Sequence, residues 1–127
     1  MIHRPALILL IATLLLAGPI AAATAATITG FARISDGDTI TIKGTRIRLN
    51  GIDAPETDQV CINKAGKNYT CGIAARDALA RLVEGRSVSC TGNDIDRYGR
   101  QIMTCVAGET DINAAMVAGG WALAFRR

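Results

Sequence analysis

The sequence contains a single histidine and no closely spaced pair of cysteines. The histidine, His3, lies near the start of the chain, and none of the four cysteines forms a C-x2-C pair. Structural zinc sites are built from such ligands, so a zinc site is not expected. The chain also lacks repeats, low-complexity tracts and internal linkers, which with its length of 127 residues predicts one small domain.

The sequence also lacks an apolar run long enough to cross a bilayer. The longest run, residues 6–20, holds about 15 residues, whereas a spanning helix needs about 20. It follows two basic residues and precedes Ala23–Ala25, which fits a small-x-small cleavage site. We therefore predict that residues 1–26 are a cleaved export signal and that a secreted or periplasmic domain spans residues 27–127. A retained membrane anchor is the alternative; a lipoprotein is disfavoured because no cysteine follows the run.

Neither sign of charge is in large excess. Without Arg4, the chain has 13 basic and 11 acidic residues, a net charge of +2, which is too small to establish a polyanionic partner. Eleven of the 14 basic residues are arginine, and a guanidinium binds phosphate through two hydrogen bonds in a way that lysine cannot. A GC-rich genome also enriches arginine, so composition leaves the partner open.

All four cysteines lie in the predicted exported part. An even number of cysteines in a small exported domain predicts two disulfides. A hairpin turn near residues 97–98 would place two of them opposite each other, within disulfide reach. We therefore predict the pairs Cys90–Cys105 and Cys61–Cys71.

Alternating and β-branched residues predict five strands. The second and third strands join at Lys43-Gly44, a hairpin turn signal. The apolar residues of this hairpin share one face, so Arg46 and Arg48 point the other way. The five strands lie within residues 27–34, 39–42, 45–49, 86–92 and 100–108.

Two segments have helical spacing. In residues 71–85 the apolar residues recur at helical intervals, Asp77 and Arg81 stand four residues apart as an ion pair, and Gly85 ends the pattern. A second, shorter helix is predicted at Ile112–Ala118. Three strands, a helix, two strands and a helix predict an α+β, mainly β domain: a five-stranded barrel of the OB type with two packed helices.

Two acidic clusters flank the predicted hairpin. Asp38 lies where the second strand begins and Asp53 where the chain leaves the third, so the hairpin brings the clusters together. Clustered carboxylates raise one another's pKa, and a hard cation such as Ca²⁺ removes that cost. Pro55 keeps Ala54 extended, which can aim its carbonyl at the same ion. The alternative is that each cluster is turn chemistry, with Asp capping backbone N–H groups.

A cation, arginines and a free carboxylate are the groups that phosphodiester hydrolysis needs: the first two stabilise charge on the phosphoryl oxygens, and the carboxylate orients or deprotonates water. Arg48 leaves the third predicted strand near the acidic clusters, and Arg100 supplies a second guanidinium at the base of the other hairpin. Arg97 is an alternative to Arg100. It lies in the turn, however, where a solvated or backbone-contacting role is expected.

The segments "DGDT", "RLNGIDAPE", "AARDALARLV", "DRYGR" and "NAAMVAGGWA" resemble the staphylococcal nuclease (thermonuclease) family in order and in spacing. The resemblance runs from about Ile34 to Ala124. It implies an OB-fold, calcium-dependent endonuclease that acts on DNA and RNA. Such an enzyme cuts the P–O5′ bond and leaves 3′-phosphate ends.

Carried over by motif position, the resemblance also assigns the metal ligands. Asp38 and Asp53 would bind Ca²⁺ directly, together with the carbonyl of Ala54, where the family has threonine. Asp36 would reach the ion through water.

The resemblance likewise assigns the reacting groups. Glu56 would be the general base for the attacking water, and Arg48 and Arg100 would clamp the scissile phosphate. Tyr98 would border the nucleotide site; its alternative role is to pack in the hairpin turn.

Two departures from the family pattern concern the cysteines, which the prototype lacks, and the end of the chain. Family members continue into a third, C-terminal helix, and we expect that helix to be absent from a sequence ending at Arg127. Trp121 and Phe125 are expected in the core. The expected molecule is a monomer that prefers single-stranded or denatured nucleic acid and does not stay on the membrane after signal cleavage.

Two other classes of protein remain as alternatives. A non-catalytic nucleic-acid-binding OB module is disfavoured because Arg48, Glu56 and Arg100 are all present. A purely structural calcium-binding domain would need the acidic clusters but not the two arginines.

Overall fold

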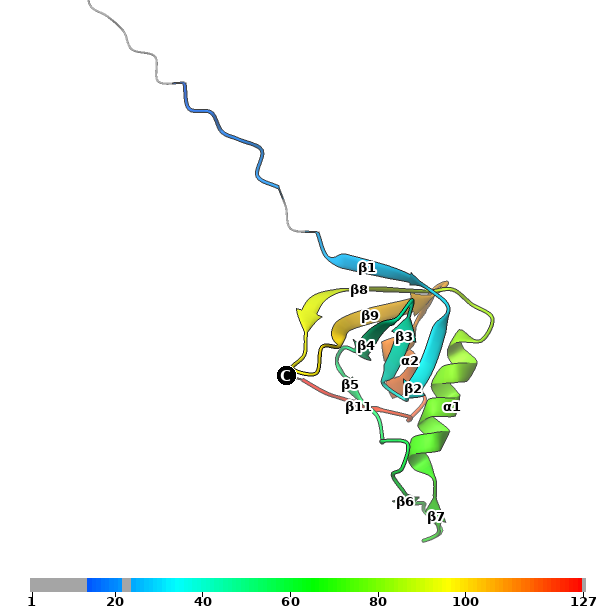
Figure 1. Cartoon of the computed structure of the whole chain (residues 1–127). Coiled ribbons are helices and arrows are strands. Elements are labelled where there is room, and N and C mark those ends of the chain that lie inside the picture. Colours follow the sequence, from blue (N-terminus) through cyan, green and yellow to red (C-terminus); the bar gives the residue numbers. More distant parts are fainter. Residues whose placement is uncertain (1–13, 22–23, 127) are drawn as a thin grey trace, which may run out of the picture.

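A curled antiparallel-rich sheet forms the body of the molecule. The structure, a computed structural model, describes residues 14–21 and 24–126, so most of the predicted export signal lies outside the described residues. The strand order is β1-β8-β9-β4-β3-β2, and β10 pairs with β9 (Figure 1). The strands of this sheet are β1 (Ala26–Gly30), β2 (Ala32–Asp36), β3 (Thr39–Ile42), β4 (Thr45–Leu49), β8 (Val88–Ile95), β9 (Gln101–Ala107) and β10 (Thr110–Asp111).

The predicted first strand is two strands rather than one. β1 pairs with β8 and β2 pairs with β3, so the two ends of the sheet are separated in sequence only by Phe31. The chain bends at this point over β3: a Cβ on Gly30 would lie 2.9 Å from Cγ2 of Ile42. β1 and β2 together act as one bent strand that curls the sheet. The result is the predicted OB-type α+β fold, mainly β with two helices.

The β3–β4 hairpin confirms its prediction. Lys43 and Gly44 both have positive φ, 50° and 78°, as a two-residue hairpin turn requires. The apolar side chains of the hairpin lie in the core at 0–1% exposure: Ile40, Ile42, Ile47 and Leu49. β4 also pairs in parallel with β9, so the hairpin joins the two halves of the sheet.

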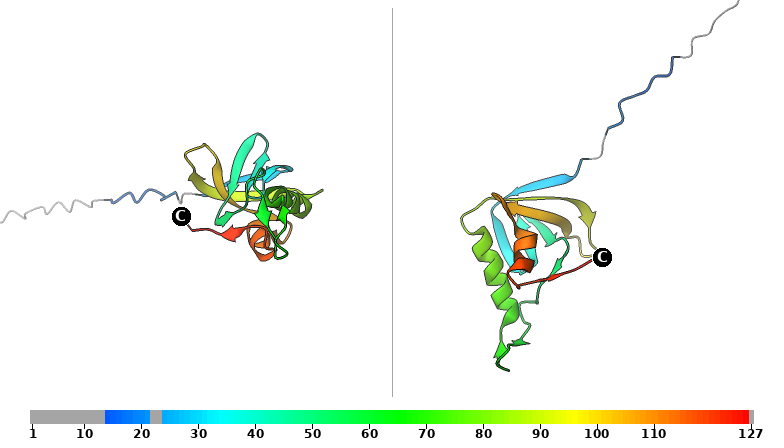
Figure 2. Two further views of the ribbon diagram at one scale, coloured as in Figure 1. Left: turned by 90° about the horizontal axis from the view of Figure 1, so that it is seen from below. Right: turned by 180° about the vertical axis from the view of Figure 1, so that it is seen from behind.

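Both predicted helices are present. α1 spans Cys71–Val83 and α2 spans Ile112–Ala118, and they lie side by side against the sheet (Figure 2). The predicted Asp77–Arg81 pair is wrong, because Asp77 accepts from both Nε and Nη2 of its neighbour Arg76 at 3.2 and 3.1 Å. Within the described residues, no helix is long and apolar enough to cross a membrane.

The segment after α2 buries Ala122 in the core, but the predicted burial of Trp121 and Phe125 is wrong. The segment forms β11 (Leu123–Ala124), which pairs with β5 (Ile52–Asp53). Trp121 is 37% exposed and lies against the turn at Gly119, where a Cβ would come within 2.7 Å of the indole ring. Phe125 is 45% exposed. Pairing with β5, continued by the hydrogen bond from the Phe125 N–H to the Gly51 carbonyl, keeps the Phe125 ring on the surface.

The two predicted disulfides form. Cys90 and Cys105 face each other across β8 and β9, and both are fully buried. Cys61 is joined to Cys71, the first residue of α1. This second disulfide fastens the irregular segment after β5, which contains the short pair β6 (Cys61–Ile62) and β7 (Asn68–Tyr69), to the start of the helix.

Candidate active site

Asp38 connects the two acidic segments. Its carboxylate is almost fully buried, and Oδ2 accepts the backbone N–H of Ala54 at 2.8 Å while Oδ1 accepts the Thr39 hydroxyl at 3.0 Å. Gly37 makes this approach possible, because a Cβ there would lie 2.9 Å from the Ala54 side chain and 2.8 Å from that of Ala75. The predicted meeting of the "DGDT" and "IDAPE" segments is therefore confirmed.

Arg48 is buried, although the strand pattern predicts an outward side chain. It lies on the face of β4 opposite Ile47 but is only 8% exposed. Nη1 lies 3.2 Å from Oδ2 of Asp38, and Nη2 lies 3.4 Å from Oδ1 of Asp53. The guanidinium thus bridges one carboxylate from each acidic segment, and these ion pairs withdraw it from solvent.

Arg100 is held by a residue that the sequence reasoning missed. Its Nε donates to Oδ2 of Asp96 at 2.6 Å, and Oδ1 of Asp96 accepts the backbone N–H groups of Tyr98 and Arg100. Burial alone would raise the pKa of Asp96, but the hydrogen bonds from Arg100 and Tyr98 outweigh it and hold this pKa below its usual value. An Asp at the start of the "DRYG" turn, four residues before Arg100, is the signal that could have found it.

Thr39 connects the two arginines. Its hydroxyl accepts from Nη1 of Arg100 at 3.5 Å and donates to Asp38, which in turn faces Arg48. Arg48 lies in β4 and Arg100 immediately precedes β9, the strand that pairs in parallel with β4. The structure therefore brings the two predicted phosphate clamps together.

The two arginines line a surface pocket of about 450 Å³. Tyr98 lies at this pocket and is 61% exposed, and the guanidinium carbons of Arg97 and Arg100 are 5.1 and 5.4 Å from its ring centroid. The ring is thus not packed away in the turn. Phe125, expected in the core, also lines this pocket.

Glu56 is exposed and is fixed through its backbone. Its N–H donates to Oε1 of Gln59 at 3.3 Å, and its carbonyl accepts from the Gln59 N–H at 2.9 Å. Gly72 of α1 packs against the same carbonyl so closely that a Cβ would lie 1.6 Å from it. Partial burial, followed by the charges of Asp36 and Asp38, raises the pKa of Glu56.

The carboxylates of Asp36, Asp38 and Asp53 lie in one region but are not arranged as a complete metal-coordination site. Asp36 accepts the Thr57 N–H at 3.3 Å, and the side chain of Asp53 is 58% exposed. Among residues 14–21 and 24–126, no three acidic, histidine or cysteine side chains are arranged to hold a metal ion. The donors themselves, carboxylate and carbonyl oxygens, suit Ca²⁺, and Asp38 and Asp53 already share one positive group, Arg48. The predicted ligand set therefore fits calcium in its chemistry and stays a prediction.

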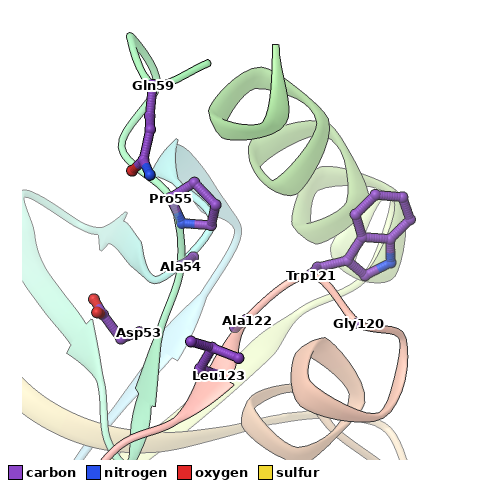
Figure 3. Close-up of a pocket in the computed structure, with 8 residues that line it drawn as sticks. All are labelled: Asp53, Ala54, Pro55, Gln59, Gly120, Trp121, Ala122 and Leu123. Carbon is purple, nitrogen blue, oxygen red and sulfur yellow. The ribbon is translucent and has the colours of Figure 1, made fainter. Parts of the chain in front are cut away.

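A second pocket, of about 270 Å³, lies on the other side of Asp53. Figure 3 shows the segment of Asp53, Ala54 and Pro55 beside the chain that leaves α2, with Trp121 at one end and Leu123 nearer to Asp53. The segment after α2 thus borders both pockets, through Leu123 here and Phe125 at the arginine pocket.

Comparison with known proteins gives one family match and several relatives. A family model described as "Staphylococcal nuclease homologue" matches residues 46–127. Succinoglycan biosynthesis protein ExoI of Rhizobium meliloti (strain 1021) is 42% identical over 101 residues, which cover 78% of this chain and 53% of the relative. Micrococcal nuclease of Shigella flexneri is 38% identical over 107 residues, which cover 74% of this chain and 56% of that relative.

An uncharacterized endonuclease of Escherichia coli O157:H7 is 35% identical over 100 residues, with 75% of this chain and 59% of the relative covered. The chain thus spans little more than half the length of these curated relatives. The family model covers well over half of the chain. The chain therefore belongs to the staphylococcal nuclease homologue family.

Proposed function

We propose that the chain is an exported, Ca²⁺-dependent, sugar-nonspecific endonuclease that hydrolyses DNA and RNA and leaves 3′-phosphate ends. The observation that carries the proposal is the shared pocket of Arg48 and Arg100, linked through Thr39 and Asp38 to the carboxylate group. Relatives named micrococcal nuclease and endonuclease support it. The name of the succinoglycan biosynthesis relative states no reaction.

In this proposal Glu56 takes the proton of the attacking water. The water oxygen forms a bond to phosphorus, the P–O5′ bond breaks, and the released O5′ takes a proton from solvent. Partial burial raises the pKa of the Glu56 carboxyl, and a carboxylate of higher pKa is a stronger base. The backbone of Glu56 is held by Gln59 and packs against Gly72, so the position from which its side chain extends is fixed.

Arg48, from β4, and Arg100, immediately before β9, would bind the non-bridging oxygens of the scissile phosphate. Guanidinium groups already placed at a pocket stabilise charge that develops there without reorganisation. Asp38, Asp53 and the Ala54 carbonyl would hold Ca²⁺, with Asp36 reaching it through water. When bound, the ion supplies further positive charge for the phosphoryl oxygens.

The test is cleavage of single-stranded DNA and RNA by the purified chain in calcium and in EGTA. We expect cleavage of both polymers in calcium only, with fragment ends that a phosphatase converts from 3′-phosphate to 3′-hydroxyl. Binding of nucleic acid without cleavage would instead support the non-catalytic OB module, and calcium binding without either would support the structural domain. N-terminal sequencing of protein recovered outside the cytoplasm tests export and cleavage after residue 26.

A further inference from the structure

The outer face of the β2–β3–β4 sheet carries two exposed arginines beside the arginine pocket. Arg33 of β2 is paired with Thr41 of β3, and Thr41 is paired with Arg46 of β4. Directly paired residues of neighbouring strands lie on the same face of a sheet. The three therefore form a row across the sheet, on the face opposite the buried isoleucines, with a half-buried threonine between two exposed arginines.

This row adjoins the candidate phosphate clamp. Arg46 and Arg48 are two residues apart on β4, so they share the outer face and their Cα atoms are roughly 7 Å apart. Arg33 and Arg46 stand two strands apart, roughly 10 Å. The row thus places two exposed guanidinium groups beside the pocket, across three strands that lie side by side in Figure 1.

The arginines of the row have no anionic partner in the described part of the chain. Every ion pair found there involves Arg48, Arg76 or Arg100. The outer face of the other end of the sheet is different, because its β1–β8 pairs Thr27–Thr91 and Thr29–Ser89 are hydroxyl contacts without charge. Unpaired positive charge is therefore concentrated on the half of the sheet that adjoins the pocket.

We propose that Arg33 and Arg46, with Thr41 between them, bind the phosphodiester backbone of a single-stranded polynucleotide whose scissile phosphate lies between Arg48 and Arg100. The inference rests on the proposed function and adds to it a surface, outside the arginine pocket, that binds the strand next to the scissile phosphate. A groove of positive charge that follows the backbone is the general means of binding single strands without sequence preference. The short Thr41 side chain leaves room for the backbone between the two arginines.

The first test measures binding in the absence of cleavage. Fluorescence anisotropy in EGTA follows an oligonucleotide longer than the ~16 nucleotides that an OB fold can cover. For Arg33→Gln/Arg46→Gln we expect binding weaker on the order of tenfold, and a salt dependence of log K lowered by about 0.7 for each lost contact. Arg33→Lys/Arg46→Lys keeps the charges and should bind like the wild type. Arg81→Gln, which removes an exposed charge on α1, should also have no effect.

The second test compares substrates of two lengths in calcium. The double glutamine variant should have a higher KM for the long oligonucleotide and unchanged kinetics on a dinucleotide with one phosphodiester bond, which is too short to reach the row. Equal loss on both substrates, or unchanged oligonucleotide binding, would overturn the proposal. The proposal would also be overturned if the double glutamine variant lost as much affinity for heparin of matched charge as for the oligonucleotide, because the face would then bind any polyanion. If the wild type cleaves nothing, the proposed function fails, and the anisotropy result still decides the role of the row.

Discussion

Arg48 and Asp38 form a buried ion pair, 3.2 Å from Nη1 to Oδ2, with side chains only 9% and 5% exposed. Each is a candidate member of the catalytic site, and each neutralises the other when no other ion is present. Removing one member of such a pair leaves an uncompensated charge in a buried place, which is far more costly than losing a surface pair. The site and the stability of the fold are therefore coupled through this contact.

The first prediction concerns Asp38. Asp38→Asn should lower the free energy of unfolding by about 3–5 kcal/mol, because it leaves the Arg48 guanidinium buried with only the exposed Asp53 as a partner. Asp77→Asn breaks the exposed pair with Arg76 and should cost less than about 1 kcal/mol. Urea unfolding measures both; equal effects would show that the Asp38–Arg48 pair does not stabilise the fold. Calcium titration should also show weaker binding for Asp38→Asn.

The second prediction concerns Glu56. Glu56→Gln should lose at least ~10²-fold in kcat, the scale of a lost general base. It should bind calcium almost normally, because the predicted direct ligands are Asp38, Asp53 and the Ala54 carbonyl. Steady-state cleavage of denatured DNA and calorimetric calcium titration measure the two effects. Glu84→Gln, at the end of α1, is the matched control, and a Glu56→Gln enzyme rescued by excess calcium would contradict the assignment.

The third prediction concerns the two clamps. Arg48→Lys and Arg100→Lys should each lose on the order of 10²-fold or more in kcat/KM, because an ammonium keeps the charge but not the two-pronged geometry. At Arg48 an ammonium also cannot bridge Asp38 and Asp53 as the guanidinium does. Arg97→Lys, in the turn beside Tyr98, should be close to wild type. The same cleavage assay applies, and an Arg100→Lys enzyme as fast as wild type would remove Arg100 from the mechanism.

The fourth prediction concerns Asp96. The pKa of Asp96 is lowered in the folded protein, so the unfolded chain binds this proton more readily. The contribution of Asp96 to stability is therefore fully present above the unfolded pKa of about 3.9. It is lost as the pH falls through the folded pKa. Wild-type stability should therefore fall on acidification below about pH 5. Asp96→Asn should show a smaller decline and, since Arg100 loses its carboxylate partner, a raised KM at neutral pH. Urea unfolding over a pH series, with Asp94→Asn as the control, checks this.

The fifth prediction separates the two disulfides. Cys90→Ala/Cys105→Ala opens a loop of about 15 residues in the core and should lower the free energy of unfolding by roughly 3 kcal/mol. Cys61→Ala/Cys71→Ala frees the segment that holds Glu56 against α1 and should lower kcat at temperatures where the protein stays folded. Thermal melts and cleavage rates of the two variants distinguish these effects. A Cys61/Cys71 variant with full kcat would show that Gln59 and Gly72 suffice to hold Glu56.

The elements that the sequence predicted well are those whose causes are local. The Lys43-Gly44 turn and α2, with its Asp111 cap and terminal glycines, depend on residues next to one another. The Cys90–Cys105 pair follows from the register of one hairpin. Each could therefore be recognised from spacing alone, as could the encounter of Asp38 with the segment of Asp53.

Most of the errors concern tertiary contacts; the Asp77–Arg81 pair is a local exception, because Asp77 accepts from its neighbour Arg76. The division of the first strand depends on a bend over Ile42 that both ends of the sheet require. Strand alternation places Arg48 on the outer face, but only the approach of Asp38 and Asp53 makes that position buried. Phe125 is exposed because its segment pairs with β5, a strand of two residues that no periodic pattern could predict.

The parallel pairing of β4 with β9 has a consequence for how the chain acquires its chemistry. Arg100 meets Thr39 across 61 positions of sequence, and Ile47 is paired with Gln101. Contacts so distant along the chain close large loops and form slowly during folding, after hairpins and helices. A chain that has already formed the β3–β4 hairpin and both helices still holds Arg48 and Arg100 apart. We therefore expect the pocket to assemble at the end of folding, so that a partly folded chain has the residues of the candidate site but not their arrangement.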